Sequence, residues 1–278
     1  MQRVGEHPTK SGPIAARWLA YELESPRAGA TGLVRVVVEN AGSATWRSRA
    51  RTGVRLAYHW LDPLGNPIVW DGVRTALDRP IAPGERAAVD LAVVAPRPPG
   101  AYVLSLDLLE EFRFWFAEVG STTLDVPVRV APRIAERRLA VVVHGGEDPE
   151  TTEALARQDE SIVDEDATAV AHLSQGAAPA SDWSRRLLDA HEEGWPAVGG
   201  AVDARGGIGT RSRRRQLQPW APGGGRNPRF ALPLLFPSLL EGLEPVEHLG
   251  FPAYTGEDVL FDGRAVVTLR PRSGRRPA

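Results

Sequence analysis

The sequence predicts two domains: an all-β sandwich of two sheets, followed by a smaller α/β domain. Its 278 residues are enough for two separate cores, since one domain takes roughly 150 residues. Between Trp18 and Val130, short apolar runs are separated by turn residues, which is the pattern of an all-β fold. After Leu139 the pattern changes, and apolar strands alternate with helical segments, which predicts an α/β layer.

Seven strands are predicted in the first domain, at 17–23, 32–39, 53–60, 67–70, 86–94, 101–109 and 122–130. The breaks between them contain proline, glycine and asparagine, because these residues accept the backbone angles of tight turns. Seven short strands with this spacing suit a sandwich of two sheets. The alternation of Val54, Leu56, Tyr58 and Trp60 turns one face of a strand inward, and His59 on the other face is expected in solvent.

One turn carries a resemblance to a known class of domain. The run Val38-Glu39-Asn40-Ala41-Gly42-Ser43-Ala44-Thr45-Trp46 resembles the N-x-G-x-x-x-W turn of bacterial immunoglobulin-like domains. As in those domains, later strands open with Pro-Gly pairs, here at 83–84 and 99–100. The resemblance implies an immunoglobulin-like sandwich over residues 17–131, after a flexible N-terminus at 1–16. Such domains mostly serve as binding, spacing or packing modules, so the fold alone does not identify a biochemical function.

Four tryptophans of this domain have two interpretations. Trp46, Trp60, Trp70 and Trp115 could stack on sugars, because sugars pack on aromatic faces. They could also fill the core or cap turns, and packing of this kind is the favoured interpretation because buried tryptophans are common in sandwiches.

The second domain is predicted at 139–270, after a charged, proline-containing linker at 132–138. The apolar run 139–143 suits a parallel strand that is buried on both faces. Asp148 and Pro149 fit the N-cap and the first position of a helix. The further elements are a helix at 149–158, a strand at 168–173, a helix at 181–193 and a strand at 197–202. Residues 271–278 are expected to form a frayed tail.

The order of these elements resembles the GT-A fold of family 2 glycosyltransferases, in a shortened form. The likeness rests on 139–144, 149–158, 169–179 with Trp183, 197–202, and the segments Leu249-Gly250-Phe251 and Gly256-Glu257-Asp258-Val259. The last two resemble the family's G-F and G-E-D segments. The resemblance implies transfer of a sugar from a nucleotide donor to a hydroxyl acceptor. Asp258 would then be the general base, with Glu257 beside it as the second candidate.

Two departures from the family's pattern argue against metal-dependent catalysis. The family's D-x-D turn holds a divalent cation through carboxylate oxygens, and here that turn reads Ser174-Gln175-Gly176. Asp164-Glu165-Asp166 does spell D-x-D, but it precedes the strand and is expected to be an acidic loop. The chain before the turn is also too short for two further strand–helix steps of the nucleotide pocket. No metal site and no cofactor are therefore predicted, a divalent cation being needed only if the chain transfers sugar.

Three further residues are candidates for ligand binding. His144 ends a predicted strand, where ligands of α/β proteins tend to bind. Ser174 stands in the turn that replaces D-x-D. Arg213 belongs to the basic cluster 211–215, which would grip phosphate through paired hydrogen bonds or would be a solvated loop. For Glu257 and Asp258, the alternative is a surface turn without a catalytic role.

Composition excludes several classes of function. The chain has no cysteine, which excludes disulfides, thiolate zinc sites and cysteine nucleophiles. The formal charge of −2 and the absence of a nucleic-acid motif argue against nucleic-acid binding. No apolar run is long enough to span a membrane, and no secretory signal is present, so a cytoplasmic location is expected.

The leading hypothesis is a glycosyltransferase-like protein of glycan or cell-envelope biosynthesis, with reduced or no metal-dependent sugar transfer. Its expected ligand is a nucleotide sugar or a glycan. The alternative is a non-catalytic module whose immunoglobulin-like domain binds a protein or a glycan, while the α/β domain gives structural support.

Overall fold

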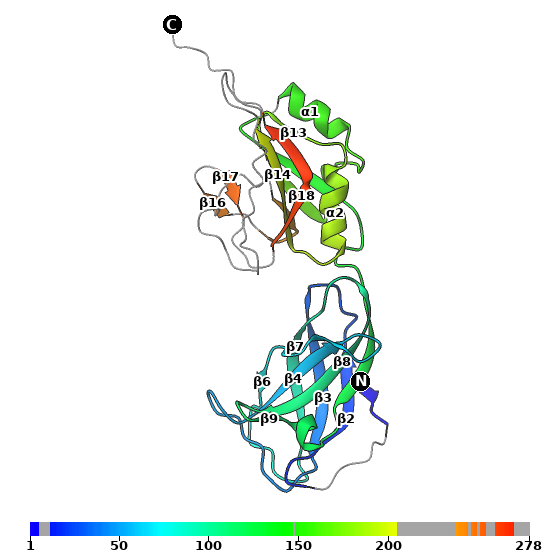
Figure 1. Ribbon diagram of the computed structural model, residues 1–278, viewed down its shortest axis with the longest axis vertical. Coiled ribbons are helices and arrows are strands. Elements are labelled where there is room, and N and C mark those ends of the chain that lie inside the picture. Colours follow the sequence, from blue (N-terminus) through cyan, green and yellow to red (C-terminus); the bar gives the residue numbers. More distant parts are fainter. Residues whose placement is uncertain are drawn as a thin grey trace. The chain divides into compact units, whose positions relative to one another are not determined.

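A computed structural model describes residues 1–5, 12–146, 148–204, 237–243, 246–248, 251–253 and 259–269. The chain divides into two compact units, Met1–Pro132 and Arg133–Ala278. Both units consist mainly of β-strands and contain few helices (Figure 1). None of the helices in the described ranges is long and apolar enough to cross a membrane.

The first unit is a sandwich of two antiparallel sheets. One sheet has the order β1 (Gln2–Arg3), β2 (Ala16–Leu23), β3 (Thr31–Asn40) and β7 (Arg86–Val94). The other has the order β10 (Leu124–Val130), β8 (Gly100–Glu110), β4 (Val54–Leu61) and β5 (Pro67–Val69), with β6 (Thr75–Ala76) on β4 and β9 (Phe114–Trp115) on β8. A short 3-10 helix, η1 (Phe116–Val119), follows β9. Immunoglobulin domains divide their strands in the same way. Their strands A, B and E correspond here to β2, β3 and β7, and their strands C, F and G correspond to β4, β8 and β10. The predicted sandwich is therefore confirmed.

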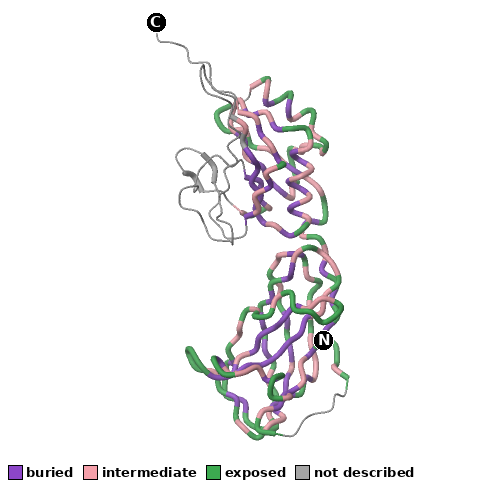
Figure 2. The backbone as a smooth tube through the Cα atoms, viewed as in Figure 1, coloured by how far each residue is buried: buried purple, intermediate pink, exposed green. Residues whose placement is uncertain are grey.

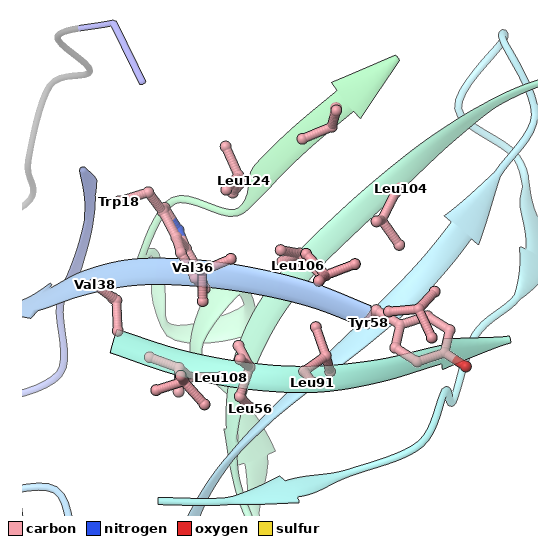
Figure 3. Packing of buried hydrophobic residues seen from close by; sticks show 14 of the residues in the cluster. Trp18, Val36, Val38, Leu56, Tyr58, Leu91, Leu104, Leu106, Leu108 and Leu124 are labelled. Carbon is pink, nitrogen blue, oxygen red and sulfur yellow. The ribbon is translucent and has the colours of Figure 1, made fainter. Parts of the chain in front are cut away.

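The core of this unit lies between the two sheets. Figure 3 shows Val36, Val38 and Leu91 from one sheet facing side chains of the other, among them Leu56, Tyr58, Leu104, Leu106 and Leu108. The predicted inward face of β4 is confirmed, because Val54, Leu56, Tyr58 and Trp60 are all buried. Each fully buried side chain of this size contributes roughly 1.5–3 kcal/mol.

Both predicted boundary segments of the first unit contain ordered structure among the described residues. Gln2 and Arg3 pair with Tyr21 and Ala20 of β2, so the predicted flexible N-terminus contains a strand. Residues 133–138, predicted as a linker, belong to the second unit, where Ile134 is part of the hydrophobic core.

The second unit is built on a mixed six-stranded sheet. Its order is β11 (Leu139–His144), β12 (Ala169–Ser174), β15 (Ser238–Leu240), β14 (Ala197–Ala204), β18 (Val259–Leu269) and β13 (Ala177–Pro179). The pairs β11–β12 and β14–β18 are parallel, and the other pairs are antiparallel. Helices α1 (Pro149–Ala156) and α2 (Trp183–Glu192) lie on the same side of the sheet (Figure 1). A separate ladder joins β16 (Val246–His248) to β17 (Phe251–Ala253).

The helices pack through an apolar stripe, and α1 begins as predicted. Trp183, Leu187 and Leu188 of α2 join the alternate residues Ala169, Ala171 and Leu173 of β12 in one buried cluster. The Asp148 side chain accepts hydrogen bonds from the backbone of Glu150 and Thr151, which confirms it as the N-cap. Figure 2 shows buried residues along the strands of both units and more exposed ones along α1.

The prediction that 139–143 forms a strand buried on both faces is wrong. β11 lies at the edge of the sheet, and Val142 is 42% exposed. Its apolar run packs on one face only: Leu139 and Val141 join the buried cluster that contains α2, and Val142 lies on the alternate face.

Candidate functional site

The candidate site lies on the outer face of the sheet β10–β8–β4 in the first unit. Strand β8 alternates, with Leu104, Leu106 and Leu108 directed into the core, so Ser105 and Asp107 belong to the outer face. The register places His59 of β4 opposite Ser105, and Ser105 opposite Asp125 of β10. A polar row therefore crosses three strands, from Asp125 through Ser105 to His59.

His59 is buried, so the expectation of a solvated histidine is wrong. The side chain is covered by two indoles: the His59 ring stacks on Trp70 at 4.2 Å between centroids and 23° between planes, and contacts Trp115 at 4.3 Å. His59 Nδ1 also lies in hydrogen-bonding contact with the backbone carbonyl of Trp70. Burial lowers the pKa of His59, so the neutral ring donates its Nδ1 proton to that carbonyl.

The two indoles form a corner above the histidine. Their centroids lie 6.2 Å apart, and their planes meet at 65°. Trp70 is 54% exposed although one of its faces is packed on His59, so a large part of the ring faces solvent. Trp46 and Trp60, in contrast, are fully buried, and for these two the packing interpretation is confirmed.

The segment that carries Trp70 is fixed to the sheet. The Gly72 N–H donates to the carbonyl of Tyr58 at 3.0 Å, and a β-carbon on Gly72 would lie 2.5 Å from the Tyr58 ring. Glycine is therefore needed here for close approach. Arg74 then joins two carboxylates, Asp71 at 2.8 Å and the buried Glu111 at 2.6 Å. These contacts hold the exposed indole in place before any ligand arrives.

Two carboxyl groups adjoin the corner, in different environments. Asp125 is exposed, and one of its oxygens accepts the Ser105 hydroxyl proton at 2.6 Å, so its other oxygen is accessible to a ligand. Asp107 is only 1% exposed and accepts backbone hydrogen bonds from Leu108 and Ala117, at 2.7 and 3.1 Å. Burial raises the pKa of Asp107 to about 7, and its carboxyl group is taken up by the backbone of the sheet and of the segment after Trp115.

In the second unit, the structure brings two of the five predicted residues together. His144 and Ser174 are register partners at the ends of the parallel strands β11 and β12. His144 Nε2 lies 3.0 Å from His172 Nδ1, on the exposed side of these strands. Glu257, Asp258 and Arg213 lie outside the described residues.

The turn after Ser174 is tied to helix α1. The Gly176 N–H donates to Asp148 at 2.7 Å, and the same carboxylate accepts the Thr151 hydroxyl proton at 2.6 Å. These bonds lower the pKa of Asp148, and its oxygens serve the turn and the helix end. Across the described ranges, no group of three histidine, cysteine or acidic residues is arranged to hold a metal ion.

The sequence did not identify the polar residues of the candidate site. Ser105, Asp107 and Asp125 appear as ordinary polar positions of alternating strands. One pattern in the sequence does point to two of them: Ser105 and Asp107 alternate with leucines, which assigns both polar side chains to the same face of the strand. Which strand lies beside which, and in what register, is not written in that local pattern.

No protein-family model matches the chain, and no curated protein sequence matches it. Similar solved structures include the C-terminal domain of wzt, at 12% identity and a TM-score of 0.31, with 42% of this chain and 73% of that chain covered. A family 123 glycoside hydrolase from Clostridium perfringens has 11% identity and a TM-score of 0.24, over 64% of this chain and 33% of its own. The seventh PapD-like domain of human CEP192 has 13% identity and a TM-score of 0.23, over 46% of this chain and 94% of its own. These scores are too low to establish a shared fold, and the identities are too low to transfer a function.

Proposed function

We propose that the protein binds a glycan on the outer face of its first unit, with Trp70 as the stacking surface. The observation that carries the proposal is a tryptophan 54% exposed to solvent, yet held from below by His59 and from the side by Trp115. In the free protein this indole exposes apolar surface to water, which is unfavourable. A ligand stacked on the ring would bury that surface and gain the corresponding free energy.

The polar row beside the indoles suits a sugar. A pyranose presents C–H bonds on its flat face and hydroxyl groups around its rim. The C–H face packs on Trp70, while the rim hydroxyls donate to the accessible oxygen of Asp125. Ser105 keeps the Asp125 carboxylate oriented. Apolar contact with a few fixed polar groups is the usual composition of a small-ligand site, and hydrogen bonds to a carboxylate are stronger than neutral ones.

The test is glycan binding by the Trp70→Ala variant. Loss of the stacking surface should raise the dissociation constant of a bound oligosaccharide about tenfold or more. This is a loss of roughly 1.4 kcal/mol of binding free energy. Ile68→Ala is the matched control, because Ile68 is also an exposed apolar residue, 50% exposed on the neighbouring strand β5. Equal effects of both substitutions, or none from Trp70→Ala, would contradict the proposal and favour a broad protein-docking surface.

The second candidate function is that of a glycosyltransferase-like protein, carried by the second unit. In its favour, 139–144, 169–174 and 197–202, three stretches of the family resemblance, lie in strands of one sheet, and 149–156 forms the helix that follows the first of them. His144 and Ser174 then stand at the strand ends where a donor would bind.

Thermal unfolding against a panel of nucleotide sugars, with and without manganese, tests the second candidate. A bound donor at a hundredfold excess over its dissociation constant stabilises the folded state by about 2.7 kcal/mol. A manganese-dependent shift with one donor, together with a sugar transfer that is lost in Asp258→Ala while the shift remains, would support a transferase. A shift without manganese would support donor binding alone, and a flat response would leave glycan binding by the first unit as the function.

A further inference from the structure

We infer that the glycan bound at Trp70 carries no acidic group, so that the site selects neutral or amino sugars over carboxylated, sulfated or phosphorylated ones. This inference rests on the proposed function and adds the chemical class of its ligand. It follows from the charges that surround the two indoles.

Two cations next to the site, Arg74 and Arg55, are already neutralised. Arg74 is bound by both Asp71 and Glu111, and its side chain is 32% exposed. Arg55 pairs with the same Glu111 at 3.0 Å and is 15% exposed. An acidic sugar would have to compete with these carboxylates for guanidinium groups that are fixed in place. Neither arginine therefore offers an open position for an anion.

The other described contacts place carboxylates beside the indoles, whereas Arg113, two residues before Trp115, lies over the Phe114 ring at 5.5 Å from its centroid. The charged groups that act on His59 are Asp71 and Asp125, and those that act on Asp107 are Glu118 and Asp125. Asp125 and Glu118 are both exposed. Glu118 is held beside Trp115 because its carboxylate accepts the N–H of that residue at 3.0 Å.

An anionic sugar would meet like charges on two sides of the corner. At about 10 Å and an effective dielectric constant of about 20, one such repulsion is large enough to weaken binding roughly tenfold. A neutral sugar meets no such repulsion, and its hydroxyls gain from the carboxylate of Asp125. The same field attracts the ammonium group of an amino sugar.

The experiment applies the full chain to an array of matched oligosaccharide pairs that differ only in one carboxylate or sulfate group. We expect binding to neutral members, with acidic members about tenfold weaker or more, and a gap that narrows at high salt. Trp70→Ala should weaken the binding of both members about tenfold or more. Glu118→Gln keeps an oxygen for the Trp115 N–H and removes one charge, so it should raise affinity for the acidic member and leave the neutral one within about twofold.

The outcomes separate the inference from the proposed function. Acidic members that bind as well as their neutral partners, with both signals weakened in Trp70→Ala, would overturn the inference and keep the glycan site. No binding to any member would overturn both. A Glu118→Gln variant that does not change the ratio between acidic and neutral partners would also overturn the inference, because its electrostatic cause would be absent.

Discussion

His191 and Asp107 are buried titratable side chains, one in each unit, and burial favours the neutral form of both. Burial lowers the pKa of His191 to about 4 and raises the pKa of Asp107 to about 7. Their effects on stability therefore have opposite signs. The stabilising contribution of Asp107 is present below about pH 4 and is lost as pH rises through about 7, whereas that of His191 is present at neutral pH and lost in acid.

At the residue scale, His191 should make the second unit sensitive to acid. His191 Nδ1 lies 2.7 Å from the Trp195 carbonyl oxygen, and Nε2 lies 3.0 Å from the hydroxyl of Ser238, so the ring joins α2 to β15. Because the unfolded chain binds the proton at about pH 6.5 and the folded unit only near pH 4, stability falls as pH drops across this window. The loss should reach on the order of 3 kcal/mol.

Hydrogen exchange of the α2 amides at neutral pH and at about pH 5 measures this loss locally. In His191→Gln the dependence on pH should be much smaller, even if the variant is less stable at neutral pH. His144→Gln, which replaces an exposed histidine, should retain the dependence of the parent chain. An unchanged dependence in His191→Gln would show that another group is responsible.

At the scale of elements, Arg137 joins the start of the second unit to helix α2. Its guanidinium pairs with Glu160 at 2.7 Å and Asp189 at 2.8 Å, and also with Glu192. The arginine side chain is 26% exposed, so the network is only partly screened by water. One planar cation with five donors can serve three carboxylates at once, which a lysine cannot do with the same geometry.

Arg137→Gln should destabilise the second unit by about 1–2 kcal/mol, because it leaves three carboxylates close together without their cation. Urea unfolding followed through the α2 region measures the change. Arg157→Gln is the matched control: it breaks an exposed pair with Glu153 at 3.3 Å and should cost no more than about 0.5 kcal/mol. Similar losses in both variants would contradict the special role of Arg137.

At the scale of the whole molecule, the two units have separate cores. All residues of the first buried cluster lie in the first unit, and all residues of the two other buried clusters lie in the second unit. A domain that buries its own core is able to fold by itself. The residues of the candidate glycan site all belong to the first unit.

Residues 1–132 produced alone should therefore unfold cooperatively and bind the same oligosaccharide with an affinity within about twofold of the full chain. Urea unfolding monitored by tryptophan fluorescence and a binding titration provide the two measurements. A fragment that folds but does not bind would show that the second unit contributes to the site. A fragment that does not fold would show that the sandwich depends on the second unit for stability.

The features that depend on neighbouring residues can be predicted from the amino-acid sequence alone. Turn residues and two-residue alternation located seven strands of the sandwich but not the short β1, β6 and β9, and Asp148 followed by Pro149 located the start of α1. These signals are local, because a turn, a cap or one face of a strand is formed by residues a few positions apart. The likeness to glycosyltransferases remains a prediction, as do the roles of Glu257, Asp258 and Arg213.

The position of the candidate site depends on contacts between segments that are distant in the sequence. His59, Ser105 and Asp125 come from three strands, and the register between those strands makes them neighbours. The burial of His59 depends on Trp70 and Trp115, which reach it from separate segments. The exposure of Val142 depends in the same way on β11 lying at the sheet edge. Contacts between distant segments are set by packing and strand order, which no local pattern encodes.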